Sequence, residues 1–336
     1  MKFGIGIPTG TEGLMYPIPF AHVRDNIKMA KAAEKLGFDS VWGNDHVSTQ
    51  HYVSEEFGCA PNYYAPLITL AAIAENTTTL KVATALLVFP FRNPAIIAKE
   101  LATLDQLSGG RAIIGVGIGA YREEFEAMEG AAAQGVNRGE MLDESLEMVA
   151  RLFKEERVTM KGKYFDLQGV QSYPKPVQDP FPFYIGGNNP NGRRRVAKYG
   201  TGWLPAVLTP GEIKAGVEDI ARLCEAEGRD IKDIDIAPQL SISIARTKEE
   251  ACKKFESSQL YKHLVSLKKS TLKDQDASNY MERNLIGTPD EISEQIQKYK
   301  EAGVTTCSAM LFAANTVDSF IEDMQLFSEE VMPNFK

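Results

Sequence analysis

The sequence has few cysteines and histidines, and neither residue type is arranged to bind a metal. Its 336 residues include four scattered cysteines with no CxxC pair: Cys59, Cys224, Cys252 and Cys307. The four histidines show no HExxH spacing. A zinc site is therefore not expected, and the cysteines are predicted to be reduced thiols, as in a cytoplasmic protein.

Long apolar runs and a surplus of positive charge are also missing. No apolar run approaches the roughly 18 residues that a membrane span requires. A strand pattern begins at Lys2, so the N-terminus does not have the form of a signal peptide. The formal net charge of -8 argues against nucleic acid or an anionic membrane as a partner. The sequence predicts a cytoplasmic protein whose partner is a small-molecule substrate, with no nucleic acid and no membrane.

Signatures of nucleophilic catalysis are missing as well. The sequence contains no GxSxG motif and no Ser-His-Asp order, and no lysine stands out at the end of a predicted strand. Hydrolase and aldolase functions therefore have little support.

The sequence does contain a regular alternation of strand and helix patterns. The clearest unit has a buried strand at 81–88, a helix at 95–107 closed by Ser108-Gly109-Gly110, and a strand at 111–116. Six more strands are predicted at 2–7, 40–42, 182–185, 202–204, 234–245 and 305–311. Eight strands, each followed by a helix, predict the α/β class and a (β/α)8 TIM barrel. A doubly wound open sheet is the alternative.

Three segments are longer than a minimal barrel needs. Residues 43–63 follow the second strand, residues 155–179 come after the fourth strand and its helix, and residues 248–285 follow the seventh strand. The second of these contains a hairpin pattern at 158–165. We therefore expect insertions after strands 2, 4 and 7. Long insertions are usually lids or interface pieces, and solvated decoration is the alternative.

The carboxyl ends of the predicted strands are where a barrel enzyme places its chemistry. His46 is the one histidine at such an end, where its imidazole can transfer a proton near neutral pH; a surface loop histidine is the alternative. The turn at 186–189 leads into a helix that carries arginines at 193–195, which favours an anionic ligand over a simple tight turn. The glycines at 115–119 lack the GxGxxG spacing, so a nicotinamide dinucleotide is not predicted.

Several segments resemble the bacterial luciferase-like superfamily of flavin- and deazaflavin-dependent oxidoreductases. The resemblance covers residues 1 to about 330 and implies a single luciferase-like TIM-barrel domain at 1–336. The segments that carry it are GFDSVW at 37–42 with NDH at 44–46, RNP at 92–94, ATLD at 102–105 with LSGGR at 107–111, GVGIG at 115–119 with EEF at 123–125, YIGG at 184–187, and GTPDE at 287–291.

The resemblance implies a flavin ring lying across the carboxyl ends of the strands. It implies a cis peptide bond between Ala85 and Leu86 behind that ring, and it makes His46 the active-site histidine. The cofactor contacts that it implies are Asp45, Thr84, Ala85, Leu86, Ile118, Gly119, Glu123, Gly186, Gly187 and Asn188. No metal is predicted, because the cysteines and histidines lack metal-binding spacing.

The resemblance leaves two cofactors open. The run at 115–125 and the segment at 200–203 look most like the branch that uses the deazaflavin coenzyme F420, whose anionic tail Arg122 and the arginines at 193–195 would receive. FMN is the alternative, in a monooxygenase that uses O2. Sugar-phosphate dehydrogenases of the F420 branch carry a glutamate directly after the GxG turn, where this chain has Ala120, so that substrate and proton donor are not implied.

The remaining alternatives concern function and assembly. A non-catalytic flavin-binding protein is one, and a cofactor-free barrel lyase is another. The resemblance also implies a homodimer, in which the helices after the second and third strands form the interface; the apolar helix pattern at 64–75 suits this role.

Overall fold

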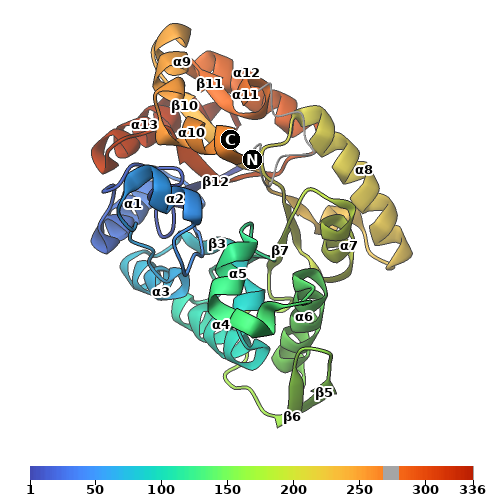
Figure 1. Ribbon diagram of the computed structural model, residues 1–336. Coiled ribbons are helices and arrows are strands. Elements are labelled where there is room, and N and C mark those ends of the chain that lie inside the picture. Colours follow the sequence, from blue (N-terminus) through green and yellow to red (C-terminus); the bar gives the residue numbers. More distant parts are fainter. Residues whose placement is uncertain (268–279, 336) are drawn as a thin grey trace.

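The computed structural model describes residues 1–267 and 280–335, in which ten strands form one curled, parallel sheet (Figure 1). These strands are β1 (Lys2–Ile7), β2 (Ser40–Gly43), β3 (Lys81–Val88), β4 (Ala112–Gly117), β7 (Phe183–Gly186), β8 (Gly202–Leu204), β9 (Asp235–Ile236), β10 (Gln239–Ile244), β11 (Leu285–Gly287) and β12 (Thr306–Phe312). Their order in the sheet is β11-β10-β12-β1-β2-β3-β4-β7-β8-β9. Neighbouring strands therefore largely follow the order of the chain, and the predicted parallel α/β architecture is confirmed.

Residues 235–244 bring the two ends of the sheet together. β9 and β10 belong to one extended segment, in which Asp235 pairs with Gly202 of β8 and Gln239 pairs with Ser308 of β12. A further parallel bridge joins Ala206 to Gln239. Among the described strands, those from β1 to β9 of this sheet follow the chain order without the central reversal point of an open doubly wound sheet, whereas β11 pairs with β10 on the side opposite to β12.

Helices lie around the outside of the curled sheet (Figure 1). Their buried positions are mainly apolar and recur at helical spacing, as expected for helices that cover a sheet. They are α1 (Val23–Lys35), α3 (Pro66–Asn76), α4 (Pro94–Ser108), α6 (Arg138–Lys154), α7 (Pro190–Tyr199), α8 (Pro210–Ala226), α12 (Pro289–Glu301) and α13 (Val317–Glu330). Thr288 and Glu291 form a capping box at the start of α12, since each backbone N–H donates to the side chain of the other residue.

Additional elements lie between the strands and at the end of the described chain. They are α2 (His51–Phe57), α5 (Arg122–Glu129), the antiparallel pair β5 (Val158–Lys161) and β6 (Asp166–Val170), α9 (Lys248–Glu256), α10 (Gln259–Leu267), α11 (Tyr280–Arg283), and the 3-10 turns η1 (Phe89–Phe91), η2 (Gly130–Ala133), η3 (Ile231–Asp233) and η4 (Met332–Phe335). The predicted hairpin is confirmed as β5–β6. Within the predicted segment at 248–285, residues 268–279 lie outside the described part.

The inside of the curled sheet is filled by side chains. Gly4 leaves room for Trp42, because a Cβ at this glycine would lie 2.4 Å from the indole nitrogen. The buried apolar residues that share this interior are Trp42, Ala83, Ala85, Ile113, Tyr184, Leu204, Ala237 and Ala309. Ligands therefore have room only at the ends of the sheet. In the described part of the chain, every helix is too short or too polar to cross a membrane.

The Glu34 carboxylate holds the turn that leads into β3. Its Oε1 accepts N–H hydrogen bonds from Thr78 at 2.8 Å, Thr79 at 2.7 Å and Leu80 at 3.0 Å. Desolvation raises the pKa of this carboxyl, but the hydrogen bonds outweigh it and lower the pKa to about 2 from 4.5. Because the folded-state pKa is the lower one, the stabilisation is present above about pH 4.5 and is lost as the pH falls toward about 2.

We predict that Glu34→Gln lowers the free energy of unfolding at neutral pH, and that the difference from the wild type narrows between about pH 5 and pH 3. Urea unfolding curves at several pH values measure this. Glu75→Gln, at an exposed carboxylate on α3, is the control and should change little. If the difference in free energy of unfolding between Glu34→Gln and the wild type stayed constant over this pH range, the lowered pKa of Glu34 would be contradicted.

Candidate active site

The predicted site residues lie at or just beyond the carboxyl ends of β2, β3, β4 and β7. His46 follows β2, Leu86 lies in the last part of β3, Gly119 follows β4, and Gly186 ends β7. These strands are consecutive neighbours in the sheet. In a parallel sheet all carboxyl ends face the same way, so residues from four separate parts of the sequence meet at one face.

The His46 imidazole is held by a buried carboxylate. Its Nδ1 lies 2.9 Å from Oε2 of Glu124, whose side chain is 3% exposed. The other carboxylate oxygen accepts N–H bonds from Val47 and Ser48. Burial raises the pKa of the Glu124 carboxyl, but hydrogen bonds from His46, Gln50 and Ser48 outweigh it and lower the pKa. Glu124 is therefore ionised at neutral pH and supplies a fixed negative charge beside His46.

Aromatic side chains surround this pair. The rings of Tyr63 and Tyr121 lie 5.3 and 5.9 Å from the His46 ring, measured between centroids. Burial is the main cause that raises the pKa of both Tyr63 and Tyr121, and the nearby Tyr52 hydroxyl adds to it. Both hydroxyls therefore stay protonated at neutral pH, and the neighbourhood of His46 offers polar but uncharged aromatic groups.

A hydrogen bond joins two of the additional helices near this site. The Tyr52 hydroxyl of α2 lies 2.9 Å from Nδ1 of His263 on α10. Burial, and then the nearby His46, lower the pKa of His263 to about 3. A neutral His263 therefore links α10 to α2, and α2 leads directly from the loop that carries His46.

The exit of β3 is irregular at the predicted position. The Ala85–Leu86 peptide bond is cis, as expected, and the pairing of β3 with β4 shifts between Thr84 and Leu87. A Cβ added to Gly117 would lie 2.5 Å from Leu86 Cδ1, and one added to Gly186 would lie 2.7 Å from it. The Leu86 side chain therefore rests on two glycines, one from β4 and one from β7.

This arrangement fits the expected flavin ring. Leu86 is only partly buried and contacts the apolar interior of the sheet, so it presents an apolar surface at the face where His46 lies. Beside it, Gly187 has a φ of +116°, and a Cβ there would find only Gly192 within 4 Å. A flat ring against Leu86 and an anionic group near the open glycine backbone at the start of α7 are both compatible with these residues.

Asp45 is engaged within the protein. Its carboxylate accepts two bonds from the Arg92 guanidinium, at 2.6 and 2.8 Å, and one from the Val88 N–H at 2.8 Å. The Asp45 side chain is 1% exposed and that of Arg92 is 20% exposed. The pair joins the end of β2 to the end of β3, so its visible role is to hold the two loops that flank the site.

The backbone of β3 and of the turn after β4 is held by contacts of Thr84, Ile118 and Gly119. The Thr84 hydroxyl is fully buried and donates to the Gly115 carbonyl at 2.8 Å. Arg138 donates to the carbonyls of Ile118 and Gly119, both at 3.1 Å, and Gly119 has a φ of +80° that favours glycine. A contact between these residues and a cofactor stays a prediction.

Asn188 and the following arginines are bonded to other parts of the fold. The Asn188 amide donates to the Ala206 carbonyl and accepts from the Ala206 N–H. Arg193 is paired with Asp219 of α8, and Arg195 is paired with Asp143 of α6. Two of the three arginines that the sequence offered to an anion therefore neutralise acidic side chains instead.

The sequence singled out Glu123, whereas the structure gives the more buried position to Glu124. The Glu123 carboxylate pairs with exposed His51, at 2.7 Å from its Nδ1, and accepts the His51 N–H. Glu124 is one residue further along α5 and lies on its buried side. The phase of this short helix decides which carboxylate meets His46, and no motif reveals that phase.

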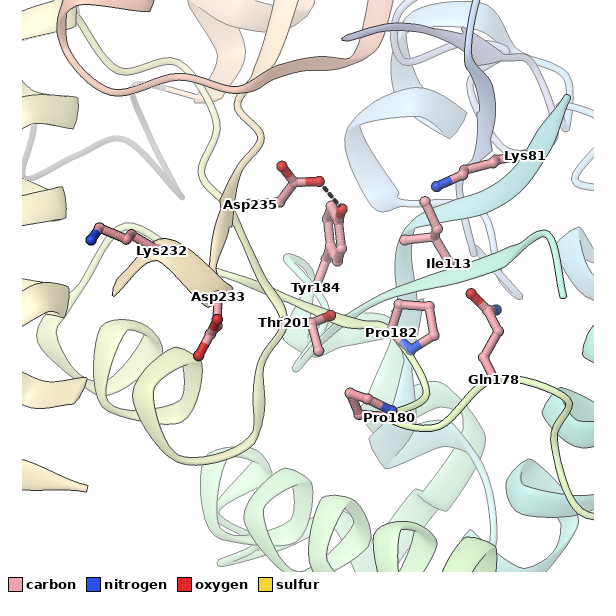
Figure 2. A pocket seen from close by; sticks show the side chains of 10 residues that line it. All are labelled: Lys81, Ile113, Gln178, Pro180, Pro182, Tyr184, Thr201, Lys232, Asp233 and Asp235. Carbon is pink, nitrogen blue, oxygen red and sulfur yellow. Dashed lines mark hydrogen bonds between the residues drawn. The ribbon is translucent and has the colours of Figure 1, made fainter. Parts of the chain in front are cut away.

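An opening lies at the end of the sheet opposite to His46, among the residues where strands begin (Figure 2). It is a cavity of about 260 Å³, and Asp235 accepts a hydrogen bond from the Tyr184 hydroxyl at its wall. The lining residues are Lys81, Ile113, Gln178, Pro180, Pro182, Tyr184, Thr201, Lys232, Asp233 and Asp235. It is remote from His46, and barrel enzymes keep their chemistry at the other face.

Comparison with known proteins identifies the family of this chain. The model of the luciferase-like monooxygenase family matches residues 1–306. The F420-dependent glucose-6-phosphate dehydrogenase of Amycolatopsis mediterranei is 29% identical over 93% of this chain and 95% of that protein. The FMNH2-dependent dimethylsulfone monooxygenase of Pseudomonas putida is 27% identical over 92% and 86%.

A solved structure supports the fold. The monooxygenase RslO1 from Streptomyces bottropensis superimposes with a TM-score of 0.80 over the full length of both chains, at 24% identity. The match to the family model covers most of the chain and includes β2, β3, β4 and β7, the strands at whose carboxyl ends the site lies. The chain therefore belongs to the luciferase-like monooxygenase family of oxidoreductases.

Proposed function

We propose that this protein transfers a hydride between coenzyme F420 and a small organic substrate, and that His46 exchanges the accompanying proton. The observation that carries the proposal is the His46–Glu124 pair at the same face as the Leu86 surface. An imidazole fixed by a buried carboxylate is suited to general acid–base catalysis. When bound, F420 supplies two-electron hydride chemistry and does not activate oxygen.

The proposal assigns parts of the chain to the cofactor. Leu86 would support the ring, with Ala85 and Thr84 behind it. Ile118 and Gly119 would border it, and Gly186 and Gly187 would lead the anionic tail to the start of α7. Asp45, Glu123 and Asn188 would act mainly by holding these loops, because their side chains are bonded within the protein.

A neutral substrate follows from the charges around the site. Arg92 is paired with Asp45, and Arg138 is occupied by backbone carbonyls. Arg193 and Arg195 are paired with acidic side chains. Because these described guanidinium groups are committed, and because Ala120 follows the GxG turn, a sugar phosphate is not our proposed substrate, although it is the substrate in the names of several relatives.

An FMN-dependent monooxygenase is the second candidate. It is favoured by the 27% identical relative whose name states FMNH2 dependence. The same residues would hold FMN, and His46 would serve the same proton transfer. A non-catalytic flavin-binding protein is a further alternative, and the His46 variant discussed below tests it.

An activity screen separates these candidates. Oxidised F420 is mixed with the protein and a panel of neutral alcohols, with glucose 6-phosphate in parallel, and F420 reduction is followed by absorbance. We expect turnover with a neutral alcohol and none with the sugar phosphate. Substrate-dependent oxygen uptake with FMNH2, together with no F420 turnover, would overturn the proposal in favour of the monooxygenase.

The proposal includes one domain at 1–336, a (β/α)8 barrel with insertions at 43–63, 155–179 and 248–285. The first and third insertions would cover the site and exclude water. The Tyr52–His263 hydrogen bond supports this arrangement, because it joins helices from these two insertions.

We also propose a homodimer through α3 and α4. Ile68 on α3 is 75% exposed and Ile96 on α4 is 56% exposed, and these helices pack together. We predict that Ile68→Glu combined with Ile96→Glu shifts the solution mass, measured by light scattering, from about two chains to one. Val177→Glu, at a similarly exposed position elsewhere, is the control. A wild-type protein of one-chain mass would contradict the dimer.

A further inference from the structure

The Nδ1 atom of His46 has two neighbours that require opposite protonation states. One requires Nδ1 to carry a hydrogen, and the other requires Nδ1 to accept one. Oε2 of Glu124 is 2.9 Å away and, being ionised, can only accept a hydrogen bond. Nε2 of Gln50 is 3.2 Å away and can only donate. A neutral imidazole nitrogen either carries a hydrogen or accepts one, so only one of these contacts is a hydrogen bond at a time.

The orientation of the Gln50 amide is fixed by other contacts. Its Oε1 accepts a bond from the Tyr63 hydroxyl at 2.7 Å, and its Nε2 donates to the Ser48 carbonyl at 3.3 Å. Gln50 is fully buried, so the amide has a defined environment on both sides. Its nitrogen therefore faces His46, because a flipped amide would place the Gln50 oxygen against the Ser48 carbonyl, which can only accept.

The contact with Glu124 prevails for three reasons. It is the shorter one, it is charge-assisted, and the carboxylate is nearly inaccessible to water that would replace the imidazole. Gln50 keeps its bond to Ser48 and also stabilises the Glu124 charge, so its nitrogen does not need His46 as an acceptor. Nδ1 therefore carries the hydrogen.

The other ring nitrogen of His46, Nε2, is available for proton transfer. Among the described residues, none makes a hydrogen bond with Nε2, and Nε2 is not one of the fully buried polar atoms that lack a partner. The His46 side chain is 12% exposed. Once Nδ1 is protonated, Nε2 has a lone pair and access to the site face.

We propose that Glu124 is a positioning residue: it fixes His46 as the Nδ1–H tautomer and so makes Nε2 the atom that exchanges a proton with the substrate. The second half of this statement rests on the proposed function, whereas the tautomer is a property of the protein alone. The proton that leaves the substrate hydroxyl is accepted by the Nε2 lone pair while the hydride goes to the bound cofactor, and the reverse reaction returns both.

Glu124→Gln separates positioning from loop structure. A glutamine keeps an oxygen for the Val47 and Ser48 N–H groups, so the loop retains its partners. It removes the charge and places its NH2 group, which can only donate, beside Nδ1. The variant should therefore fold with an unchanged backbone spectrum while the tautomer preference of His46 weakens.

The tautomer is read directly by 15N-histidine labelling and long-range 1H–15N correlation at about pH 8, above the usual histidine pKa of about 6.5. His46→Gln identifies the His46 signals among those of the four histidines. We expect a pyrrole-type Nδ1 and a pyridine-type Nε2 in the wild type. In Glu124→Gln both nitrogens should move toward intermediate positions. Glu123→Gln is the matched control and should affect His51 signals alone, because Glu123 pairs with His51.

The result that overturns the inference is a wild-type His46 protonated at Nε2, or a Glu124→Gln spectrum with the wild-type tautomer. In the F420 assay we expect Glu124→Gln to lower kcat at least about tenfold with the cofactor Kd within about threefold, whereas Glu126→Gln, an exposed residue of the same helix, changes neither. Tautomer relaxation without turnover of any tested substrate would uphold the positioning role and count against the proposed function. Turnover by the wild type together with an unchanged His46 tautomer in Glu124→Gln would uphold the proposed function and count against the positioning role.

Discussion

His46→Ala is expected to lower kcat by about 10²–10⁴-fold, the usual contribution of a general acid–base residue. The substitution removes the one group that we assign to proton transfer, while Leu86 and the glycines that would hold the cofactor remain. The cofactor Kd should therefore stay within about threefold of the wild-type value. Steady-state kinetics and a fluorescence titration on the same preparation measure both quantities.

The matched control for this variant is His22→Asn. His22 caps α1 at an exposed position, where its ring nitrogen accepts the Arg24 N–H, and asparagine preserves the cap. It should leave kcat and Kd unchanged. If His46→Ala retained the wild-type kcat, His46 would have no catalytic role. If neither the wild type nor His46→Ala turned over any substrate while both bound the cofactor, the flavin-binding alternative would be favoured.

Arg92→Met is expected to destabilise the protein by about 3–5 kcal/mol, because it leaves the Asp45 carboxylate buried without its cation. The Asp45 side chain is 1% exposed and would retain only the Val88 N–H as a partner. Equilibrium urea unfolding measures the difference. The same variant should loosen the exit of β3, so we also expect weaker cofactor binding.

The double variant Arg92→Met with Asp45→Asn identifies the cause. Removing the orphaned charge should restore part of the lost stability, since a neutral amide is less costly to bury than a carboxylate. Arg151→Met breaks an exposed pair with Glu155 and should cost less than about 1 kcal/mol. A cost this small for Arg92→Met would show that the Asp45–Arg92 pair does not hold the site loops.

The sequence predicted the parallel α/β fold because buried strands leave a strong local signal. The strand at 81–88 is observed with the same bounds, and the strand at 111–116 is displaced by one residue. The strand expected at 234–245 is observed as β9 and β10 instead. Pro238 lies between them and lacks the N–H that a continuous ladder requires.

The finer features of the site depend on contacts between distant parts of the chain. From the sequence alone, the arginines at 193–195 predict an anion-binding site. In the structure, Asp219 pairs with Arg193 and Asp143 pairs with Arg195, and these aspartates lie on two other helices. The identity of the carboxylate beside His46 depends on the rotation of α5, which is only eight residues long. Neither pairing has a periodic signal. The cis bond at Ala85–Leu86 was expected only through the family resemblance, since no residue type announces it.

The most direct measurement is an equilibrium titration of the purified protein with F420 and, separately, with oxidised and reduced FMN, followed by fluorescence in the absence of oxygen. The account predicts that F420 binds in the micromolar range or tighter, and that FMN in either state binds at least about tenfold more weakly. Tight FMN binding without measurable affinity for F420 would contradict it.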